Sequence, residues 1–510
     1  MEGQAAGWDL SALWPAVVLA VGGLVALMLE VSRFRRLAGT ISAVFTVLAG
    51  AVLFLGSPGD PSPLTNVLAL ELANDYLVWA MAPVFLLSAL AVHLLGGRHL
   101  ERHGRYRAEF HALVSFSAAG MLILVQARDL LVFFLGLETL SIPLYVLCGF
   151  VSNRERSVES GLKYFTIGAF SSAFIAFGLA LVYGAFGTLS FAEMTPALDA
   201  IVGGDAGRLL LARGGLGMLI VGFGFKIAAV PFHAWAGDVY QGAPTPVTIL
   251  LAVGSKAAGL AGLIRILAGP LGEIPGWVSP AIVVAAVTLI VGNCVATVQE
   301  DVKRLIAYSG ISHAGFLLVG LVAHQRVGQP IEGGFIVDLA NQPALQALLF
   351  YVIAYALMTL GALVIVEHVE QAPDERTRLI DLAGLVHRQP LLAGALLILL
   401  LSLGGMPPLA GFFGKWMVLK TAVDGGLMPL AIVAVLASVV GFYYYLRIVL
   451  QAFLMPVRES AREPGRLGWS AAFLIGFTVA ATLLLGFWPG WLLERLEGPL
   501  PQAALAALSR

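Results

Sequence analysis

The chain has 510 residues, of which 59% are hydrophobic and only 12% charged, and its mean hydropathy is +0.89. Soluble domains carry about 25% charged residues, so this composition excludes a soluble protein and indicates one embedded in a bilayer. The formal net charge of −1 points to no nucleic-acid partner. Cys148 and Cys294 fall in apolar segments without metal-ligand spacing, so we expect two buried small residues rather than a disulfide or a metal pair.

Apolar segments follow one another along the whole chain, each close to the ~20 residues that cross a bilayer. We identify 14, at about 11–31, 38–56, 76–96, 111–127, 129–150, 162–186, 214–236, 245–268, 279–298, 304–323, 344–367, 391–420, 428–453 and 470–493. The connections between them leave no room for a soluble domain. No basic region or cleavage site marks the first segment as a signal peptide, so we expect it to be retained. The sequence therefore predicts an all-α polytopic integral membrane protein with 14 transmembrane helices.

Lysine and arginine are distributed unequally between the connections. The odd-numbered connections hold 17 of the 30, and the even-numbered connections with the two tails hold 6. Connections rich in these residues stay in the cytoplasm. We therefore expect a multi-pass protein of the inner (plasma) membrane, with cytoplasmic odd-numbered connections and both termini on the periplasmic side.

Prolines interrupt two of the segments. Pro231 follows Lys226 by five residues in the seventh segment, and Pro407-Pro408 precede Lys415 in the twelfth. A proline inside a helix removes a backbone hydrogen bond, and within a membrane such a break is tolerated where it is buried in protein or lines a wet cavity. Segments 4–8 and 9–13 form two groups of five that run in opposite directions, and the broken segment is fourth in each. Interrupted helices at matching places in inverted units point to a transport site.

This pattern predicts four parts of the chain. They are three N-terminal helices (1–110), a first five-helix proton-channel unit (111–270), a second and inverted five-helix unit (271–455), and a C-terminal helix with its tail (456–510).

Charged side chains near the centres of apolar segments carry the main indication of function. They are Glu138, Lys226, Lys256 and Lys415. An ionised group at the bilayer midplane costs roughly 2.5–3.5 kcal/mol on insertion scales, and such groups usually line a pathway or a relay. A buried amine gives up its proton more easily than one in water, while a nearby carboxylate favours the charged form. We therefore expect these four residues to transfer protons.

Three further residues are candidates for the same relay. Lys163 follows Glu159 at an i,i+4 spacing that suits a helical ion pair. His233 lies seven residues after Lys226, which would place both on one helical face, and His313 follows Ser309 at i,i+4. A histidine titrates near neutral pH, so either could pass on protons.

Other interpretations of these residues remain open. The four midplane charges could form structural pairs between helices. Lys163 could extend to the membrane interface beside Glu159, and His313 could be a hydrogen-bonded packing residue. Arg265 and Arg447 lie near segment ends, so we expect them to extend to the interface.

Cofactor motifs are absent from the sequence. No two of the histidines well inside segments share a helix, which argues against haem ligation. There is no GxGxxG after a soluble strand, no cysteine cluster and no P-loop. We therefore expect no NADH, flavin, iron–sulfur cluster, ATP or metal to bind this chain itself.

Three long motifs resemble one known family. They read FKIAAVPFHAWAGDVYQGAPTPVTILLAVGSKAAGLAGLIRIL, VQEDVKRLIAYSGISHAGFLLVG and GGMPPLAGFFGKWMVL. They are similar to the antiporter-like membrane subunits of respiratory complex I, the proton-pumping NADH:quinone oxidoreductase, and most similar to the subunit N branch. The resemblance covers about residues 70–450.

The resemblance implies a role for each matched residue. Glu138 would be the acid of span 5 and Lys226 its ion-pair lysine on the broken span 7. Lys256 would be the central lysine of span 8, Lys415 the span-12 lysine near the exit half, and Lys163 the span-6 lysine.

The resemblance also implies partners. Protons would cross the lipid bilayer through this chain, while NADH, FMN, iron–sulfur clusters and quinone bind other subunits. Subunit M and the small subunits K and J would be its neighbours.

The sequence departs from the family pattern in three places. Family members commonly have a proline before the aspartate where this chain has Trp235-Ala236-Gly237-Asp238, an acid where Gln241 stands, and a second serine where Gly310 stands. Two alternative functions also stay open. One is a subunit of a multi-subunit cation/proton antiporter or membrane-bound hydrogenase. The other is a structural membrane scaffold whose charges no longer conduct.

Overall fold

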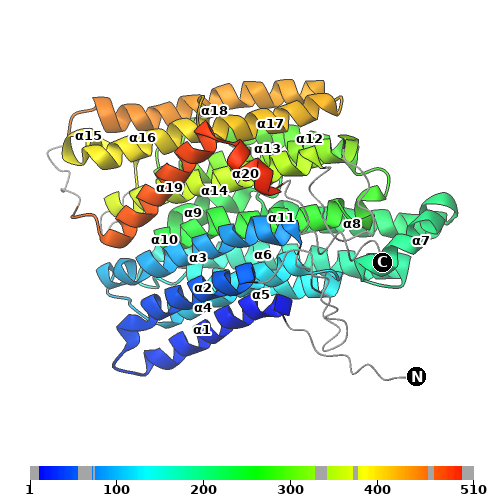
Figure 1. Ribbon diagram of the computed structural model, residues 1–510, viewed down its shortest axis with the longest axis horizontal. Coiled ribbons are helices and arrows are strands. Elements are labelled where there is room, and N and C mark those ends of the chain that lie inside the picture. Colours follow the sequence, from blue (N-terminus) through cyan, green and yellow to red (C-terminus); the bar gives the residue numbers. More distant parts are fainter. Residues whose placement is uncertain are drawn as a thin grey trace.

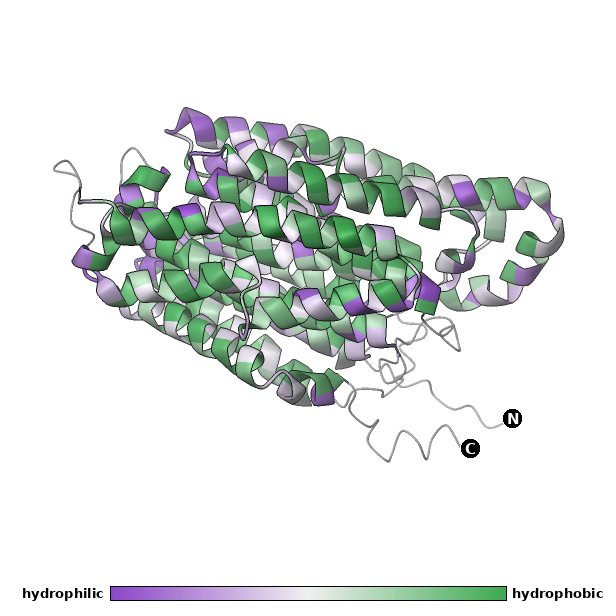
Figure 2. Ribbon diagram, turned by 90° about the horizontal axis from the view of Figure 1, so that it is seen from above, coloured by the Kyte–Doolittle hydropathy of each residue, from purple (hydrophilic) through white to green (hydrophobic). Residues whose placement is uncertain are grey.

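The computed structural model describes residues 11–55, 72, 75–327, 342–370, 377–457 and 465–496. Within these ranges the regular structure is helical, and strand-like pairing is limited to the isolated bridges Leu72–Ala127, Asp129–Ser190 and Asp301–Arg378. The long helices run side by side in one bundle, and α7 projects at one end (Figure 1). Hydrophobic residues dominate the helix shafts, while hydrophilic residues concentrate toward the helix ends (Figure 2).

The helices follow one another with short connections. In the first half they are α1 (Trp14–Glu30), α2 (Ala38–Leu55), α3 (Tyr76–Arg102), α4 (Glu109–Gln126), α5 (Leu130–Cys148), α6 (Glu155–Phe186), α7 (Phe191–Gly204), α8 (Ala206–Lys226), α9 (Ala234–Gly242), α10 (Thr245–Ile249), η3 (Leu250–Ser255) and α11 (Lys256–Leu267). In the second half they are α12 (Val278–Thr297), α13 (Val302–Val327), α14 (Pro343–Val369), α15 (Leu385–Arg388), α16 (Pro390–Gly404), α17 (Ala410–Asp424), α18 (Met428–Leu454), α19 (Trp469–Phe487) and α20 (Gly490–Leu496). Short 3-10 turns η1 (Ser11–Leu13), η2 (Arg35–Leu37), η4 (Pro270–Glu273) and η5 (Leu379–Leu382) lie at or between helix ends.

The predicted fold class is confirmed. Twelve helices of the described residues are long and apolar enough to cross a membrane, and α1 and α16 are shorter apolar helices. Each predicted segment overlaps a helix or a pair of helices. The count of 14 passes, the inverted arrangement of two units and the four domain boundaries remain predictions. The termini, predicted to be periplasmic, lie outside the described residues.

Connections of the same parity meet at the same end of the bundle. Lys303, in the ninth connection, donates a hydrogen bond to the carbonyl of Ala243 in the seventh. At the other end, Arg213 in the sixth connection donates to the carbonyl of Pro275 in the eighth. We call the end that gathers the odd-numbered connections the basic end.

Both predicted helix breaks are present. In the seventh segment α8 ends at Lys226 and α9 begins only at Ala234, with Pro231 between them. In the twelfth segment α16 ends at Gly404 and α17 begins at Ala410. Each break contains a cis X-Pro peptide bond. Ala228, two residues after Lys226, has a φ of 60°, a conformation that costs a residue with a Cβ about 1–3 kcal/mol and is found most often at functional sites.

The eighth segment is continuous but irregular. It runs from Thr245 to Leu267 and is buried inside the bundle along its length. Its middle, Leu250–Ser255, is π-helical and ends directly before Lys256. Such wide turns occur mostly as single insertions in α-helices, frequently at functional sites.

Two expectations about individual residues are wrong. Cys294 is exposed on the outer surface of α12, whereas Cys148 is buried as expected. Arg265 is 4% exposed and does not reach the interface, because it forms a buried ion pair with Asp75, with Nη2 2.8 Å from Oδ1. Arg447 is half-buried and donates to the carbonyl of Thr297, at the end of α12.

Candidate functional site

Lys226 lies at the end of α8, where the seventh segment breaks, and is 4% exposed. Its ammonium donates to the hydroxyl of Ser141 on α5 at 2.8 Å and to that of Tyr164 on α6 at 3.4 Å. The same nitrogen lies 5.7 Å from the centre of the Tyr164 ring, within the range of a cation–π interaction. Hydroxyls and a ring therefore surround this amine, and no carboxylate of the described residues is in direct contact with it.

Glu138 is half-buried on α5, one helical turn before Ser141. Its Oε1 accepts a hydrogen bond from Ser172 on α6 at 2.5 Å. The described contacts include no ion pair between Glu138 and Lys226, so the pair implied by the family resemblance is not closed in this structure. Each partner instead bonds to its own serine, and Ser141 lies between them.

Lys256 lies in the middle of the eighth segment and is 3% exposed. Its ammonium donates to the backbone carbonyl of Gly310 on α13 at 2.7 Å and lies 5.6 Å from the centre of the Tyr355 ring on α14. A Cβ at position 310 would lie 2.6 Å from this nitrogen. The glycine at position 310 therefore makes the space that the amine occupies.

His313 lies one turn after Gly310 on α13 and is 3% exposed. Its Nδ1 is hydrogen-bonded to the hydroxyl of Tyr351 at 2.6 Å, and its Nε2 to that of Tyr445 at 3.0 Å. Tyr445 is also hydrogen-bonded to Ser309. The predicted Ser309–His313 pair is thus linked through a tyrosine of α18.

Lys415 on α17 is 7% exposed and faces the break of the twelfth segment. Its ammonium donates to the carbonyl of Gly404 at 3.1 Å, the last residue of α16, where the helix dipole is negative. It also lies 5.3 Å from the centre of the Phe316 ring.

These side chains form one buried series that crosses the bundle. Lys226 packs against Gly259, one turn beyond Lys256, since a Cβ at 259 would lie 3.0 Å from its Cγ. Tyr355, which contacts Lys256, has its ring 4.7 Å from that of His313. The series ends with Lys415: the ring of Phe316, which this lysine faces, lies 5.9 Å from that of Tyr351, a partner of His313.

Lys163 lies apart from this series. Its side chain is 40% exposed, and its ammonium pairs with Glu159 at 2.6 Å, as the spacing predicted, and with Asp238 of α9 at 2.7 Å. Asp238 also pairs with Arg304 of α13. Burial raises the pKa of Asp238, but hydrogen bonds from Lys163 and Arg304 outweigh this and hold it below its usual range. Arg304 also lies 3.4 Å from Gln241, one of the positions that depart from the family pattern.

The expectation that His233 shares a helical face with Lys226 is wrong. The helix ends at Lys226, and His233 is the half-buried residue that precedes the separate helix α9. Because the helix is interrupted between the two residues, their seven-residue spacing does not place them on one face.

The partners of the charged residues were not identified from the sequence. They are Ser141, Tyr164, Ser172, Tyr351, Tyr355 and Tyr445. Tyr351 and Tyr355 stand at i,i+4 in a helix whose window is 94% buried, and this polar stripe was a usable signal. Among the described residues, no group of three or more histidine, cysteine, aspartate or glutamate side chains is arranged to hold a metal ion.

Comparison with known proteins identifies close relatives. The sequence model of the family described as "NADH:quinone oxidoreductase/Mrp antiporter, TM" matches residues 127–441. NADH-quinone oxidoreductase subunit N of Myxococcus xanthus (strain DK1622) is 37% identical over 508 residues, which are 96% of this chain and 97% of the relative. NADH-quinone oxidoreductase subunit N 2 of Roseiflexus castenholzii is 40% identical over 479 residues, 93% of this chain and 92% of the relative.

Solved structures show the same architecture. A chain of respiratory complex I from Thermus thermophilus is 34% identical, with a TM-score of 0.76 over 94% of this chain and 99% of that chain. A chain of the Mrp complex from Dietzia sp. DQ12-45-1b has a TM-score of 0.78 over 96% of both chains, but at 22% identity this likeness shows the fold alone.

Proposed function

Because the chain belongs to the NADH:quinone oxidoreductase/Mrp antiporter transmembrane family, with subunit N of NADH-quinone oxidoreductase as its near full-length relatives, we propose that it moves protons across the membrane. In this proposal it is a membrane-arm subunit of a proton-translocating NADH:quinone oxidoreductase, and quinone reduction in other subunits supplies the energy. NADH, FMN, the iron–sulfur clusters and quinone bind those other subunits.

The observation that carries the proposal is the series of buried lysines with the hydroxyls, the histidine and the aromatic rings packed between them. Lys226, Lys256 and Lys415 each lie against an aromatic ring and donate to a neutral oxygen. A buried ammonium without a carboxylate beside it carries an uncompensated desolvation cost, so its proton is released more readily than in water. Tyr355 and His313 stand between Lys256 and Lys415, with the Tyr355 ring in contact with both Lys256 and His313.

Glu138 controls the first of these lysines. If its carboxylate turns from Ser172 toward Lys226, the negative charge favours the ammonium form of Lys226. At an effective dielectric of ~20, a pair ~6 Å apart interacts by roughly 3 kcal/mol, equivalent to about a hundredfold change in proton affinity. When the carboxylate returns to the serine, the proton can move on to the neutral amine of Lys256. Opening and closing this pair thus couples a movement of α5 and α6 to proton transfer.

Substitution of Lys256 tests the proposal. In membrane vesicles that contain the assembled complex, Lys256→Ala should abolish NADH-driven proton uptake through this subunit and leave assembly intact. A correctly assembled Lys256→Ala complex that pumps at the full rate would contradict the proposal and would favour a structural scaffold. If the chain co-purifies with a peripheral arm other than that of an NADH dehydrogenase, the antiporter or hydrogenase alternative is correct instead.

The resemblance supplies the finer proposals. Subunit M and the small subunits K and J are the proposed neighbours, and the cell inner membrane is the proposed location. We assign the basic end to the cytoplasm and the opposite end to the periplasm, from the distribution of lysine and arginine.

A further inference from the structure

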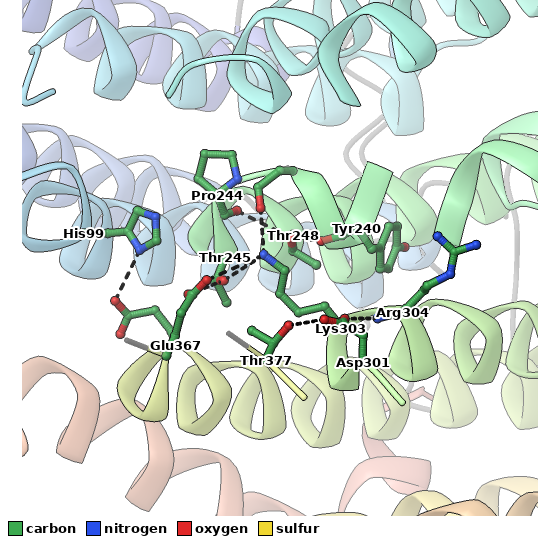
Figure 3. Close-up of polar contacts among 12 residues, drawn as sticks. His99, Tyr240, Pro244, Thr245, Thr248, Asp301, Lys303, Arg304, Glu367 and Thr377 are labelled. Carbon is green, nitrogen blue, oxygen red and sulfur yellow. Dashed lines mark hydrogen bonds and ion pairs between the residues drawn. The ribbon is translucent and has the colours of Figure 1, made fainter. Parts of the chain in front are cut away.

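A second group of buried polar side chains lies at the basic end, apart from the lysine series. The group, which we call the basic-end cluster, comprises His99 and Arg102 of α3, Thr245 of α10, Lys303 of α13, Glu367 of α14, and Glu370 directly after α14. Figure 3 shows His99 and Glu367 pointing toward each other, and Lys303 reaching toward Thr245. The proposed function assigns no role to any of these residues.

Glu367 connects the cluster with the aqueous surface. Its side chain is 5% exposed, pairs with Arg102 and lies 3.6 Å from Nδ1 of His99, which is 1% exposed. Arg102 is 38% exposed. The ring of His99 lies 4.7 Å from that of His103, a half-buried residue just beyond the end of α3. Titratable groups therefore lead from the surface to a buried carboxylate.

Glu370 is the deeper carboxylate, with a side chain only 2% exposed. Its Oε2 accepts a hydrogen bond from Thr245 at 2.5 Å, and its Oε1 lies 3.8 Å from the ammonium of Lys303. Within the part of the chain that the structure describes, Oε1 accepts no hydrogen bond. Lys303 gives its own hydrogen bonds to the carbonyl of Ala243 at 2.8 Å and to Thr245 at 3.1 Å. This buried carboxylate oxygen therefore has unused capacity to accept a hydrogen bond.

Cations surround the two glutamates on several sides. The charged or titratable groups that face the pair are Lys303, Arg102, Arg154, His99 and His103, and Asp301 faces Lys303. Burial raises the pKa of Glu370, but Lys303, His99, Thr245 and Arg154 together hold it below its ordinary value. Glu370 is therefore ionised at neutral pH, and any proton that reaches it is passed on rather than kept.

Helices that carry residues of the cluster also extend toward Lys256. Thr245, which bonds to Glu370, is the first residue of the segment that carries this lysine. On α14, Tyr355 and Thr359 are one turn apart and share a face, with Tyr355 against Lys256, while Glu367 lies two further turns toward the basic end of the same helix. On α3, Ser88 faces the π-helical turn, since a Cβ at Gly254 would lie 2.5 Å from its hydroxyl.

The interval along α14 between Thr359 and Glu367 is longer than one hydrogen bond. Eight residues separate Thr359 from Glu367, which is ~12 Å at the helical rise. Transfer over this interval requires water between polar groups.

From this arrangement we infer that the basic-end cluster takes up protons from the aqueous phase and delivers them to Lys256. This inference rests on the proposed function, in which Lys256 carries a proton. A proton passes from water to the imidazoles of His103 and His99 and then to the carboxylates of Glu367 and Glu370. The proton then moves along α14 to the neutral amine of Lys256. The cluster then has its starting charge, and one proton has moved inward for each cycle.

The competing interpretation is a purely structural ion-pair network that ties together the ends of α3, α10, α13 and α14. Removing both charges of an ion pair at once distinguishes the structural interpretation from the proton-uptake interpretation. Replacing both members of a buried ion pair with neutral side chains is often nearly neutral for stability, whereas removing one member strands the other charge. A structural pair is therefore rescued by removing its partner as well, and a proton carrier is not.

The test uses the double variant Glu367→Gln/Arg102→Gln in the complete complex, in inside-out membrane vesicles whose outer medium contacts the basic end. Assembly, NADH oxidation and proton uptake are measured together at several values of the outer pH. The matched control is Glu101→Gln/Arg36→Gln, which removes an exposed ion pair of 3.8 Å at the same end of the bundle.

We expect the double variant to assemble and its proton transfer through this chain to be at least about tenfold slower, seen as fewer protons taken up for each NADH oxidised, since a positioned acid or base contributes at least that much to the rate of proton transfer. The loss should grow as the outer pH rises, because protons must then reach the path without a buried acceptor. The control should match the wild type. Uptake equal to the wild type at every pH overturns the inference.

Two further variants test the inference if the double variant does not assemble, and they distinguish it from the proposed function. If the double variant does not assemble, His99→Gln gives the same test, because it removes the titratable ring and leaves the lysine, arginine and glutamate charges in place. His99→Gln with wild-type uptake at every pH also overturns the inference. Lys256→Ala in the same vesicles separates the two proposals. If Lys256→Ala stops uptake while the cluster variants do not, only the uptake site is wrong; if Lys256→Ala pumps fully, the proposed function itself fails.

Discussion

The ammonium of Lys256 donates a hydrogen bond to the backbone carbonyl of Gly310 at 2.7 Å, across the contact between the eighth segment and α13. A backbone acceptor cannot take up or release a proton, so it holds the amine in place without competing for its charge. The absence of a side chain at Gly310 leaves room for the amine beside the hydroxyl of Tyr355. Position 310 therefore fixes where the central lysine lies.

Gly310→Ala should displace this amine. The new Cβ would lie 2.6 Å from Nζ and 3.0 Å from the Tyr355 hydroxyl, so the flexible end of the lysine must move. Loss of a hydrogen bond to a charged group costs about 1.5–3 kcal/mol, and we expect proton uptake to fall by about tenfold. Gly310→Ser should be milder, because its hydroxyl offers a replacement acceptor. Gly320→Ala, also on α13, is the control, since the nearest atom to its new Cβ would be the flexible Cδ1 of Leu348 on α14, at 2.8 Å.

Lys256→Arg separates a proton carrier from a fixed charge. Arginine keeps the positive charge and the hydrogen bonds but stays protonated in proteins. If Lys256 carries the proton, the arginine variant should assemble and pump as poorly as Lys256→Ala, with a loss of about a hundredfold in the step it serves. Proton uptake by reconstituted vesicles measures both variants. A fully active arginine variant would show that the residue supplies only a fixed charge.

Glu138→Gln should impair proton transfer without preventing assembly. It removes the carboxylate that can turn toward Lys226 but keeps an amide oxygen able to accept the hydrogen bond from Ser172. We expect uptake to fall by about tenfold or more. Glu138→Asp should be milder, because the charge survives on a shorter side chain. Glu193→Gln, on the exposed surface of α7, is the control, and full pumping by an assembled Glu138→Gln complex would disprove the role.

Asp238→Asn should loosen α9. This carboxylate holds both Lys163 and Arg304, and its pKa is below the usual value. A depressed pKa in the folded state means that the stabilisation is present above the unfolded-state pKa and is lost as the pH falls through the folded-state value. We therefore expect the variant to lower the thermal stability of the complex at neutral pH. The difference from the wild type should shrink in acid, where both side chains are uncharged; thermal unfolding in detergent at several pH values measures it.

Reporter fusions test the orientation of the chain in the membrane. Fusions at the connection of residues 103–108 should report the cytoplasm, and fusions at residues 269–277 the periplasm, because the odd-numbered connections carry most of the lysine and arginine. The opposite result would reverse the direction of proton movement assigned to the basic-end cluster.

Much of the fold follows from two sequence signals. Long apolar runs set the helices, and the prolines at 231 and 407–408 mark the two breaks, because a proline removes a backbone hydrogen bond and the freed groups must find partners within the protein. The π-helical turn before Lys256 gave no such signal, since Leu250–Ser255 contains no residue that forbids an ordinary helix.

The site was predictable in its charges but less so in its contacts. Lysines within apolar helices stand out by their cost. Arg265 appeared as an interfacial residue because its partner, Asp75, is 190 residues away in sequence. Glu367 and Glu370 gave no signal either, as they lie at the end of their segment, where charged residues ordinarily reach water. Their burial depends on how the ends of four helices meet.

The π-helical turn has a consequence for how the length of the eighth segment can vary among related chains. A turn of this kind holds one residue more than an α-helical turn needs. Deleting one residue within Leu250–Ser255 would make the helix regular and leave Thr245 and Lys256 on their present faces. The same deletion elsewhere between Thr245 and Leu267 would rotate one part against the other by about 100° and carry the lysine away from Gly310. A related chain that is one residue shorter can thus keep the contact between this lysine and position 310, provided that the missing residue falls in this turn.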